Sequence, residues 1–268
     1  ISSVFEIKNL LLLSPLLVPV FQVPVNAQDE IIVTAPKLQA PIYESVYART
    51  VLAQAYLQKS ANERLDAALS GVAGFSLFRR SDSRSANPTT QGATLRGLGP
   101  NGAGRTLVLL DGVPQNDPFG GWVYWSTLPR TALERVVIHR GGGAGPFGSG
   151  ALSGVIELES ASVEPGITGD FAGGSRGLFS GYVTAGAHVG PVRARLQLYG
   201  GREDGFHLLP EEQRGAVDVP ASYRQFGGAL DLATDIGERM ILSTRIAGFA
   251  ENRVNGNDLA PNETEAFE

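Results

Sequence analysis

Residues 179–199 read FSGYVTAGAHVGPVRARLQLY, two runs of residues separated by the tight turn Gly190-Pro191. Apolar and polar side chains alternate in both runs. Successive side chains of a β-strand point to opposite faces of the sheet, so this period of two predicts an antiparallel hairpin with one apolar and one polar face. Two more alternating runs follow, at 225–232 and 242–251. We therefore expect consecutive antiparallel strands from residue 162 onward.

The length of these runs is typical of membrane-spanning β-strands, which place apolar side chains toward lipid and polar side chains toward the lumen of a barrel. A soluble sandwich with one hydrated face is the alternative. Connection lengths favour the barrel, because 189–192 and 234–239 are short whereas 202–222 and 252–268 are long and polar. Four or five strands leave an open edge, which is costly in lipid. We therefore expect 162–268 to be the first strands of a truncated barrel.

The region from 37 to 161 is predicted to be a small α+β domain, because one helical pattern is followed by several short strand-like runs. Residues 60–63 have the spacing of a capping box, and apolar residues then share one helical face. That face consists of Leu65, Ala68, Leu69 and Val72. The strand-like runs are Phe75–Phe78, Thr106–Leu110, Arg135–His139 and Val155–Glu159.

The first 27 residues have the features of an export signal. Lys8 precedes a long uncharged, mostly apolar stretch, and small residues before Gln28 fit cleavage after Ala27. A transmembrane helix is the alternative, but Pro15, Pro19 and Pro24 would interrupt it. The sequence therefore predicts a signal peptide over residues 1–27.

A short β-branched segment, Asp29–Ala35, follows the predicted cleavage site within residues 28–36. No hairpin turn lies next to it that would pair it locally. An unpaired strand of this kind is suited to adding itself to the sheet edge of another protein. An ordinary first strand of this protein is the alternative.

Charge and residue types argue against several classes of function. The net charge of -5 does not favour nucleic-acid binding, and the three histidines lack the spacing of metal ligands. Residues 143–148 match a dinucleotide-binding glycine pattern, but the glycines at 148, 150 and 154 would break the helix that such a site needs. No nucleophile with a base is visible. We expect neither an enzyme nor a bound cofactor or metal.

Four motifs occur in a fixed order along the chain. They are DEIIVTA at 29–35, TLRGLG at 94–99, LVLLDGVP at 107–114, and ERVVIHRG at 134–141 continued by FGSGALSGVI at 147–156. In this set the chain resembles the TonB-dependent outer-membrane receptors. Ala73 and Gly142-Gly143 depart from that family's pattern, which has proline at these turns.

The resemblance implies an α+β plug domain, here residues 37–161, inside an antiparallel transmembrane β-barrel of about 22 strands. It also implies that Asp29, Glu30, Ile31, Ile32, Val33, Thr34 and Ala35 form the TonB box, which binds the TonB complex of the inner membrane. The implied function is energy-coupled uptake of a scarce nutrient chelate, such as an iron–siderophore or cobalamin, across the outer membrane. The N-terminus would be periplasmic. A passive adhesin or a phage or toxin receptor is the alternative.

Two connections between plug strands are the candidate ligand-binding segments, because binding residues concentrate on loops held by rigid scaffolds. The first, Arg79–Gln91, contains Arg79, Arg80, Asp82, Arg84 and Asn87. The second, Gln115–Trp125, contains Asn116, Asp117, Phe119, Trp122, Tyr124 and Trp125. Aromatic rings are suited to stacking on a flat ligand, and arginine side chains are suited to binding an anionic ligand. The alternative for both tryptophans is a wedge between plug and barrel wall.

Arg96 and Arg140 are the candidates for holding the plug in the barrel. Each lies beside a glycine at the end of a strand, where its guanidinium group is placed to pair with carboxylates of the lumen. A solvated charge at the rim of the plug is the alternative.

Overall fold

The computed structural model describes residues 48–60, 64–79, 83, 86–96, 104–142, 147–148, 150–237, 240–259 and 261–267. The chain divides into two compact units, 1–39 and 40–268, and all described residues belong to the second. The predicted signal peptide and TonB box lie outside the described residues. So do most residues of the predicted capping box.

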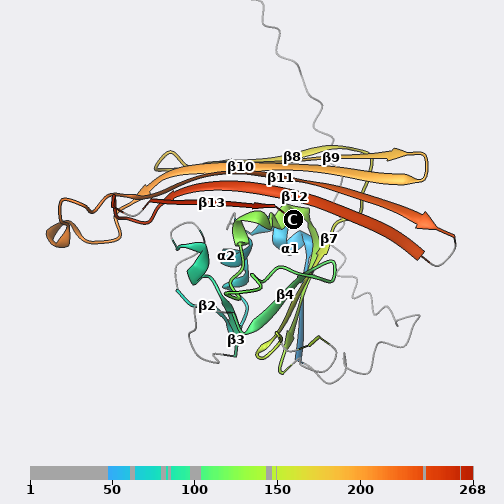
Figure 1. Cartoon of the computed structure of the whole chain (residues 1–268), viewed down its shortest axis with the longest axis horizontal. Helices are drawn as coiled ribbons and strands as arrows, with labels where there is room; N and C mark the ends of the chain where they lie inside the picture. The colour runs from blue at the N-terminus through green and yellow to red at the C-terminus, as the bar shows by residue number, and fades with distance from the viewer. Residues whose placement is uncertain are drawn as a thin grey trace, which may run out of the picture. The chain divides into compact units, whose positions relative to one another are not determined.

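The plug contains a mixed sheet of five strands in the order β1-β6-β7-β4-β5 (Figure 1). β4 and β7 are parallel, and the other neighbouring pairs are antiparallel. The strands are β1 (Ala48–Ala53), β4 (Thr106–Leu110), β5 (Val113–Pro114), β6 (Leu133–Arg140) and β7 (Gly154–Ser160). A separate pair consists of β2 (Phe75–Leu77) and β3 (Ala93–Leu95). The helices are α1 (Gln54–Lys59), α2 (Leu65–Leu69), and the 3₁₀ helices η2 (Pro88–Thr90), η3 (Trp125–Thr127) and η4 (Arg130–Ala132).

The plug core lies between this sheet and the helices. Val108, Ile138 and Ile156 come from the three central strands and pack in one buried cluster with residues of both α-helices. Gly154 begins β7 at a φ of +145°, and a Cβ there would clash with the carbonyl oxygen of His139. Only glycine therefore lets β7 approach β6 this closely.

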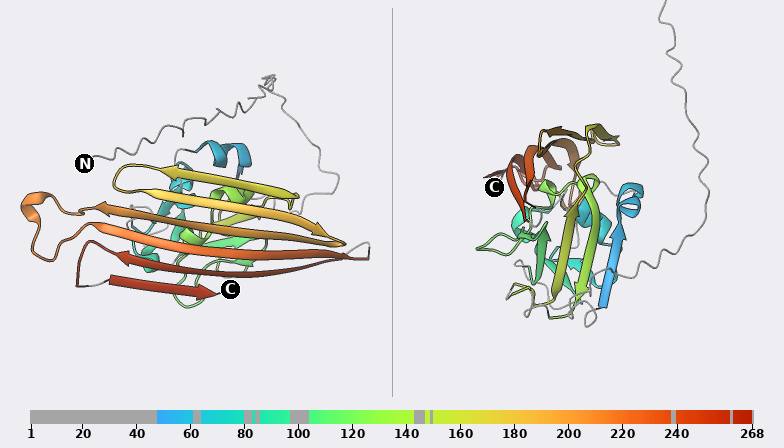
Figure 2. Two further views of the ribbon diagram at one scale, coloured as in Figure 1. Left: turned by 90° about the horizontal axis from the view of Figure 1, so that it is seen from above. Right: turned by 90° about the vertical axis from the view of Figure 1, so that its right-hand side faces the viewer.

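The second sheet has six strands in sequence order, β8 to β13, all paired antiparallel within the described part of the chain (Figure 2). We call it the wall sheet. Its strands are β8 (Gly166–Gly173), β9 (Phe179–Val189), β10 (Val192–Phe206), β11 (Ala221–Ile236), β12 (Met240–Val254) and β13 (Pro261–Phe267). The sequence predicted four or five strands. The alternating runs correspond to β9, β10, β11 and β12. β8, whose glycine-rich sequence GITGDFAG carries little alternation, was missed, and so was β13, which lies within the predicted long connection 252–268.

The two faces of the wall sheet have the reverse of the polarity found in a soluble protein, where the apolar face of a sheet is buried. In β10, Leu196 and Leu198 are 44% and 42% exposed, whereas Arg195 and Gln197 between them are 6% and 2% exposed. The apolar side chains thus point away from the protein, and the polar ones point toward the plug. A soluble sandwich buries its apolar face, so the pattern is that of a transmembrane barrel wall.

The strands end in connections of two kinds. Gly190-Pro191 joins β9 to β10, and a short connection at 237–239 joins β11 to β12. At the other end, the long loop 207–220 contains the 3₁₀ helix η5 (Glu211–Gln213) and bridges to the next connection through Asp218 and Asn257. The prediction of a long connection at 252–268 was wrong, because β12 continues to Val254 and β13 begins at Pro261. No helix in the described ranges is long and apolar enough to span a membrane.

Candidate functional site

The second candidate segment, Gln115–Trp125, is a compact loop fastened to β4 by Asn116. The Asn116 Oδ1 accepts a hydrogen bond from the Val108 amide at 2.7 Å, and its Nδ2 donates to the carbonyl oxygens of Thr106 and Gly121 at 3.1 Å each. Both polar atoms of the amide are therefore engaged by the protein. Asn116 thus builds the loop, and it also lines the cavity beside the wall sheet, so ligand contact by this residue stays a prediction.

The tip of this loop presents aromatic rings. Asp117 Oδ1 accepts hydrogen bonds from the amides of Phe119 at 2.9 Å and Gly120 at 2.6 Å, which folds the tip back on itself. A Cβ on Gly120 would clash with the ring of Trp122, so glycine is needed for that ring to cover the backbone. Phe119 is 98% exposed at the tip. Phe119 is thus the aromatic side chain of the loop most accessible to a ligand.

Asn116→Ala tests the structural role of this residue. We expect it to lower the free energy of unfolding by about 1–3 kcal/mol, because it removes the acceptor of the partly buried Val108 amide of β4 and one donor each to the carbonyl oxygens of Thr106 and Gly121. The measurement is urea unfolding of the full-length receptor, followed by tryptophan fluorescence. Gln115→Ala is the control, because the Gln115 Nε2 bonds carbonyl oxygens of its own turn at 3.3 and 3.5 Å. Equal stability of the two variants would contradict the assignment.

Trp125 requires a correction. Its side chain is 1% exposed, packs edge-on against Phe75 in the plug core, and donates from Nε1 to the Gln91 carbonyl oxygen at 3.1 Å. A ring enclosed in the core cannot contact a ligand, so we remove Trp125 from the candidate set. It instead ties the end of the second segment to the end of the first.

The first candidate segment, Arg79–Gln91, is described in part. Arg79 is exposed, whereas Arg80, Asp82 and Arg84 lie outside the described residues. Asn87 Oδ1 accepts hydrogen bonds from the amide of Thr89 at 3.1 Å and from its hydroxyl at 3.0 Å, so Asn87 shapes the start of η2. Its role, like that of Asn116, is to hold a turn.

Ser83, which sequence reasoning did not single out, links this segment to both the plug and the wall sheet. Its amide and hydroxyl donate to the Asp66 carboxylate of α2 at 2.7 and 2.8 Å. Its carbonyl oxygen accepts from Arg253 Nη2 of β12 at 2.7 Å. All three bonds are buried. The segment is therefore fixed at Ser83 between a plug helix and a wall strand.

The buried side chains around Ser83 carry equal numbers of positive and negative charges. Arg253 Nε pairs with Glu251 Oε1 at 2.9 Å, and the Arg64 guanidinium lies 4.7 Å from the centre of the Tyr223 ring. Burial acts to lower the pKa of Arg64, but Tyr223, Asp66 and Glu251 outweigh it and raise that pKa above its ordinary value. Two arginines thus face two carboxylates in a buried cluster.

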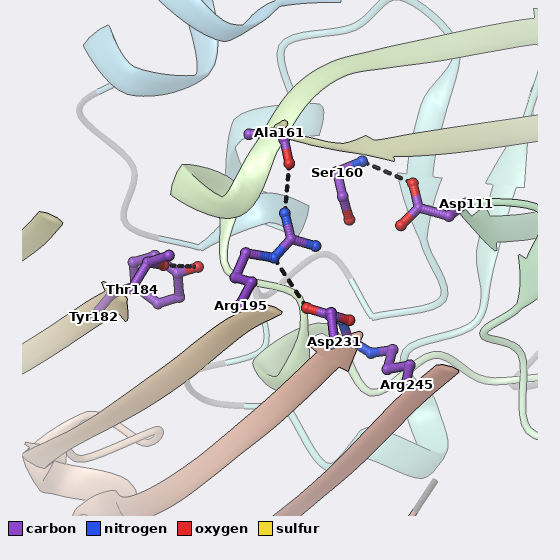
Figure 3. A network of polar contacts seen from close by, with 8 residues as sticks. All are labelled: Asp111, Ser160, Ala161, Tyr182, Thr184, Arg195, Asp231 and Arg245. Atoms are coloured by element: carbon purple, nitrogen blue, oxygen red, sulfur yellow. Dashed lines mark hydrogen bonds and ion pairs between the residues drawn. The ribbon is translucent and has the colours of Figure 1, made fainter. Parts of the chain in front are cut away.

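A second contact joins the plug to the wall sheet through Arg195 of β10 (Figure 3). Arg195 Nη1 donates to the carbonyl oxygen of Ala161 at 2.5 Å, just after the last plug strand. Its Nε donates to Asp231 of β11 at 3.0 Å, and Arg245 Nη1 of β12 donates to the same carboxylate at 2.8 Å. At both contacts a wall arginine donates to a backbone carbonyl of the plug.

The predicted lock residues lie elsewhere. Arg140 Nε donates to the Ala73 carbonyl oxygen at 3.1 Å, a contact inside the plug. Arg96 is exposed and has a φ of +61°, with its amide bonded to the Gly74 carbonyl oxygen. That these two arginines lock the plug stays a prediction. The wall arginines that do contact the plug lie at alternating polar positions of the strands, which was the available signal.

A cavity of roughly 300 Å³ lies between the second segment and the wall sheet. Asp117 and Tyr124 line it from the plug, and Tyr199, Arg245 and Phe249 line it from the wall. The rings of Tyr124 and Phe249 are 5.4 Å apart between centroids. This cavity brings a predicted ligand residue, Tyr124, next to wall residues that the sequence did not single out.

Comparison with known proteins accounts for this architecture. Residues 41–155 match the family described as the TonB-dependent Receptor Plug Domain. The chain is 29% identical over 140 residues to the vitamin B12 transporter BtuB of Vibrio vulnificus, covering 52% of this chain and 22% of the relative. It is 26% identical over 156 residues to the transporter of the same name from Photobacterium profundum, covering 58% and 24%.

The solved structures share the fold. The siderophore receptor PirA of Acinetobacter baumannii superposes with a TM-score of 0.62 at 17% identity, over 82% of this chain and 34% of that one. The ferric enterobactin receptor PfeA of Pseudomonas aeruginosa gives a TM-score of 0.57 at 15% identity, over 77% and 33%. The chain thus spans about a quarter of the length of the curated relatives and about a third of the length of the chains in these structures. Residues 41–155 thus form a plug domain of the TonB-dependent receptor type, and the open antiparallel sheet that follows has the fold of the barrel strands in these receptor structures.

Proposed function

We propose that the chain is part of an outer-membrane receptor for TonB-coupled uptake of a scarce nutrient chelate, such as an iron–siderophore or cobalamin. The observation that carries the proposal is a plug domain packed against the polar face of a wall sheet whose apolar face is exposed. In a closed barrel, a plug bonded to the wall in this way would occupy the lumen, so passage of a ligand would require the plug to move. The relatives are transporters of vitamin B12 and receptors of siderophores by name.

The proposed cycle begins when a ligand contacts the two plug segments and the long loops of the wall. The box at Asp29–Ala35 then pairs as a strand with TonB, and the proton-motive force is used to remodel the plug. The wall arginines Arg195 and Arg253 each donate a hydrogen bond to a backbone carbonyl oxygen of the plug. Contacts of this kind break one at a time, so the plug can move without unfolding the wall.

Growth tests the proposed function against a passive role. A strain with the intact gene is expected to grow faster than a deletion strain on limiting iron supplied as ferric enterobactin, or in a vitamin B12 auxotroph supplied with limiting cyanocobalamin. Restoring the gene should restore growth. A passive adhesin or phage receptor would leave growth on every supplied chelate unchanged.

Tyr124→Ala and Arg80→Ala test the ligand contacts. We expect each to weaken binding about tenfold, since a lost aromatic stack or cation contact is worth about 1 kcal/mol or more. Binding of ferric enterobactin and cyanocobalamin to the purified full-length variants is the measurement. Tyr56→Ala, on α1, is the control because Tyr56 is solvent-accessible but does not line the cavity. Unchanged affinity in both variants would move the ligand site onto the barrel loops.

A further inference from the structure

A shallow groove of roughly 360 Å³ lies on the apolar, outward face of the wall sheet. One row of paired residues crosses it on β8, β9, β10 and β11, in the order Phe171, Gly181, Gly200 and Phe226. The two glycines have no side chains, so they form a low floor between the two rings. Both rings lie against this floor, since a Cβ on Gly181 would be 2.9 Å from Phe171 and a Cβ on Gly200 3.5 Å from Phe226. The groove is therefore apolar and open to the surroundings of the sheet.

Two arginines lie at one end of the groove. Arg202 of β10 and Arg224 of β11 are direct partners in the strand register, and both are exposed and line the groove. Like charges directly opposite each other on one face of a sheet are destabilising. Neither guanidinium group has a hydrogen bond or an ion pair with another described residue. The other arginines of β10 and β12 each pair with a carboxylate, and they are Arg193, Arg195, Arg245 and Arg253.

Within the described part of the chain, no carboxylate neutralises this pair. The residues that line the groove include no aspartate and no glutamate. Asp204 follows Arg202 by two residues on β10, but its carboxylate lies against Gly177 in the turn before β9, where a Cβ on Gly177 would clash with it. Two positive charges therefore face outward at the end of an apolar groove.

The arginines lie where the apolar band of the wall sheet ends. The outward positions of β10 before Arg202 carry no charge and are Val192, Ala194, Leu196, Leu198 and Gly200. The stretch from Val192 to Arg202 is about 33 Å long, or about 25 Å across a membrane at the usual tilt of a barrel strand, and the apolar band of such barrels has this height. Arg202 and Arg224 are thus placed at headgroup level. They lie toward the long loop 207–220, and in barrels the longer loops face the cell exterior.

We propose that this groove binds a lipid with a phosphorylated headgroup from the outer leaflet of the membrane. Lipid is what contacts the outward face of a barrel wall. The phosphate lies between Arg202 and Arg224, where it accepts charge-assisted hydrogen bonds and removes the repulsion between them. One acyl chain lies on Gly181 and Gly200, between the two phenylalanine rings. The proposal rests on the outer-membrane location within the proposed function, but it concerns no transported ligand.

Binding of three matched probes to the full-length receptor, purified in a neutral detergent, tests the proposal. Dimyristoyl phosphatidate has a phosphate and two chains, dimyristoylglycerol has the same chains without the phosphate, and inorganic phosphate has no chain. Native mass spectrometry gives the affinity for the first lipid bound. We expect phosphatidate to bind at least about tenfold more tightly than dimyristoylglycerol, the range of one charge-assisted hydrogen bond. Inorganic phosphate at the same concentration should not displace it.

The double variant Arg202→Gln, Arg224→Gln should lose this preference for phosphatidate. Gly200→Leu, which places a side chain on the floor of the groove, should weaken the binding of both lipids. Arg193→Gln is the matched control and should bind as the wild type does, since Arg193 lies near the other end of β10 and pairs with Asp235 at 2.7 Å. A normal circular dichroism spectrum confirms folding of each variant.

Four results would each overturn the proposal. They are equal binding of the two lipids to the wild type, an unchanged preference in the double variant, wild-type affinity in Gly200→Leu, and displacement of phosphatidate by an equal concentration of inorganic phosphate. None of them depends on TonB or on a transported ligand, so failure here is distinct from failure in the growth test.

Discussion

A full-length receptor carrying Ile32→Pro is expected to bind its ligand at the cell surface but to accumulate none of it. Proline has no amide hydrogen and fixes φ, so it removes one bond from any ladder between the box and a TonB strand and restrains the backbone. Ile32 lies at the centre of the β-branched segment Asp29–Ala35. Because no hairpin turn adjoins this segment, pairing with another protein is its expected use.

The measurement is accumulation of radiolabelled ferric enterobactin or cyanocobalamin in energised cells, alongside binding to the same cells on ice. Ile32→Val is the control, because valine keeps both the amide and the β-branched side chain. It should accumulate ligand as the wild type does. Normal accumulation in Ile32→Pro would show that the segment is not the TonB box.

Glu251→Ala is expected to have the largest effect on stability, lowering the free energy of unfolding by about 3–5 kcal/mol. Glu251 and Arg253 are 1% and 2% exposed in their side chains, and Arg64 lies in the same buried cluster. Removing the carboxylate leaves two buried guanidinium groups facing Asp66 alone. The expected loss of folding stability comes from uncompensated buried charge, and it is larger than the loss from removing one hydrogen bond.

Glu159→Ala provides the comparison, because Glu159 pairs with Arg135 at 2.6 Å on the exposed side of the plug, with side chains 38% and 48% exposed. An exposed ion pair contributes about 1 kcal/mol or less. Urea unfolding of the full-length receptor should therefore separate the two variants clearly. If Glu251→Ala were no more destabilising than Glu159→Ala, the cluster would not join plug and wall as described.

The strands of the wall sheet were predictable because their signal is local. Alternation along 179–199 predicted the two strands, which pair with each other residue by residue. In β10, exposed and buried side chains alternate from Arg195 to Tyr199, as the pattern predicts. β1, α1, β8 and β13 were missed because none of them carries a clear apolar–polar period of its own. β1, for example, pairs along its whole length with β6, which lies more than eighty residues later in the chain.

The candidate site was predictable as a pair of loops but not as a set of contacts. Asn87, Asn116 and Asp117 were expected to bind a ligand, and in the structure their side chains hold turns. Asn116 and Asp117 also line the cavity beside the wall sheet, so ligand contact by these residues stays a prediction. Asparagine and aspartate serve both purposes, so composition does not separate the two. Trp125 entered the core for a similar reason, since an aromatic side chain suits a core as well as a binding surface.

The contacts between plug and wall depend on residues far apart in the sequence. Arg253 and Ser83 are 170 residues apart, and Arg195 and Ala161 are 34 apart. No local pattern indicates such pairs. Sequence reasoning assigned the lock to plug arginines, whereas the described contacts are made by arginines of the wall. The polar face of the wall strands was nevertheless visible in the alternation, so its residues were candidates for contact with the plug.

The central claim, energy-coupled uptake, is tested most directly by ligand accumulation in cells that have or lack TonB. Cells expressing the full-length receptor would be supplied with radiolabelled ferric enterobactin or cyanocobalamin, with surface binding measured in parallel. We predict that one of these ligands accumulates well above its surface-bound amount when TonB is present, and that only the surface-bound amount remains when TonB is absent. Equal accumulation with and without TonB, or no accumulation of either ligand in cells that have TonB, would contradict the claim.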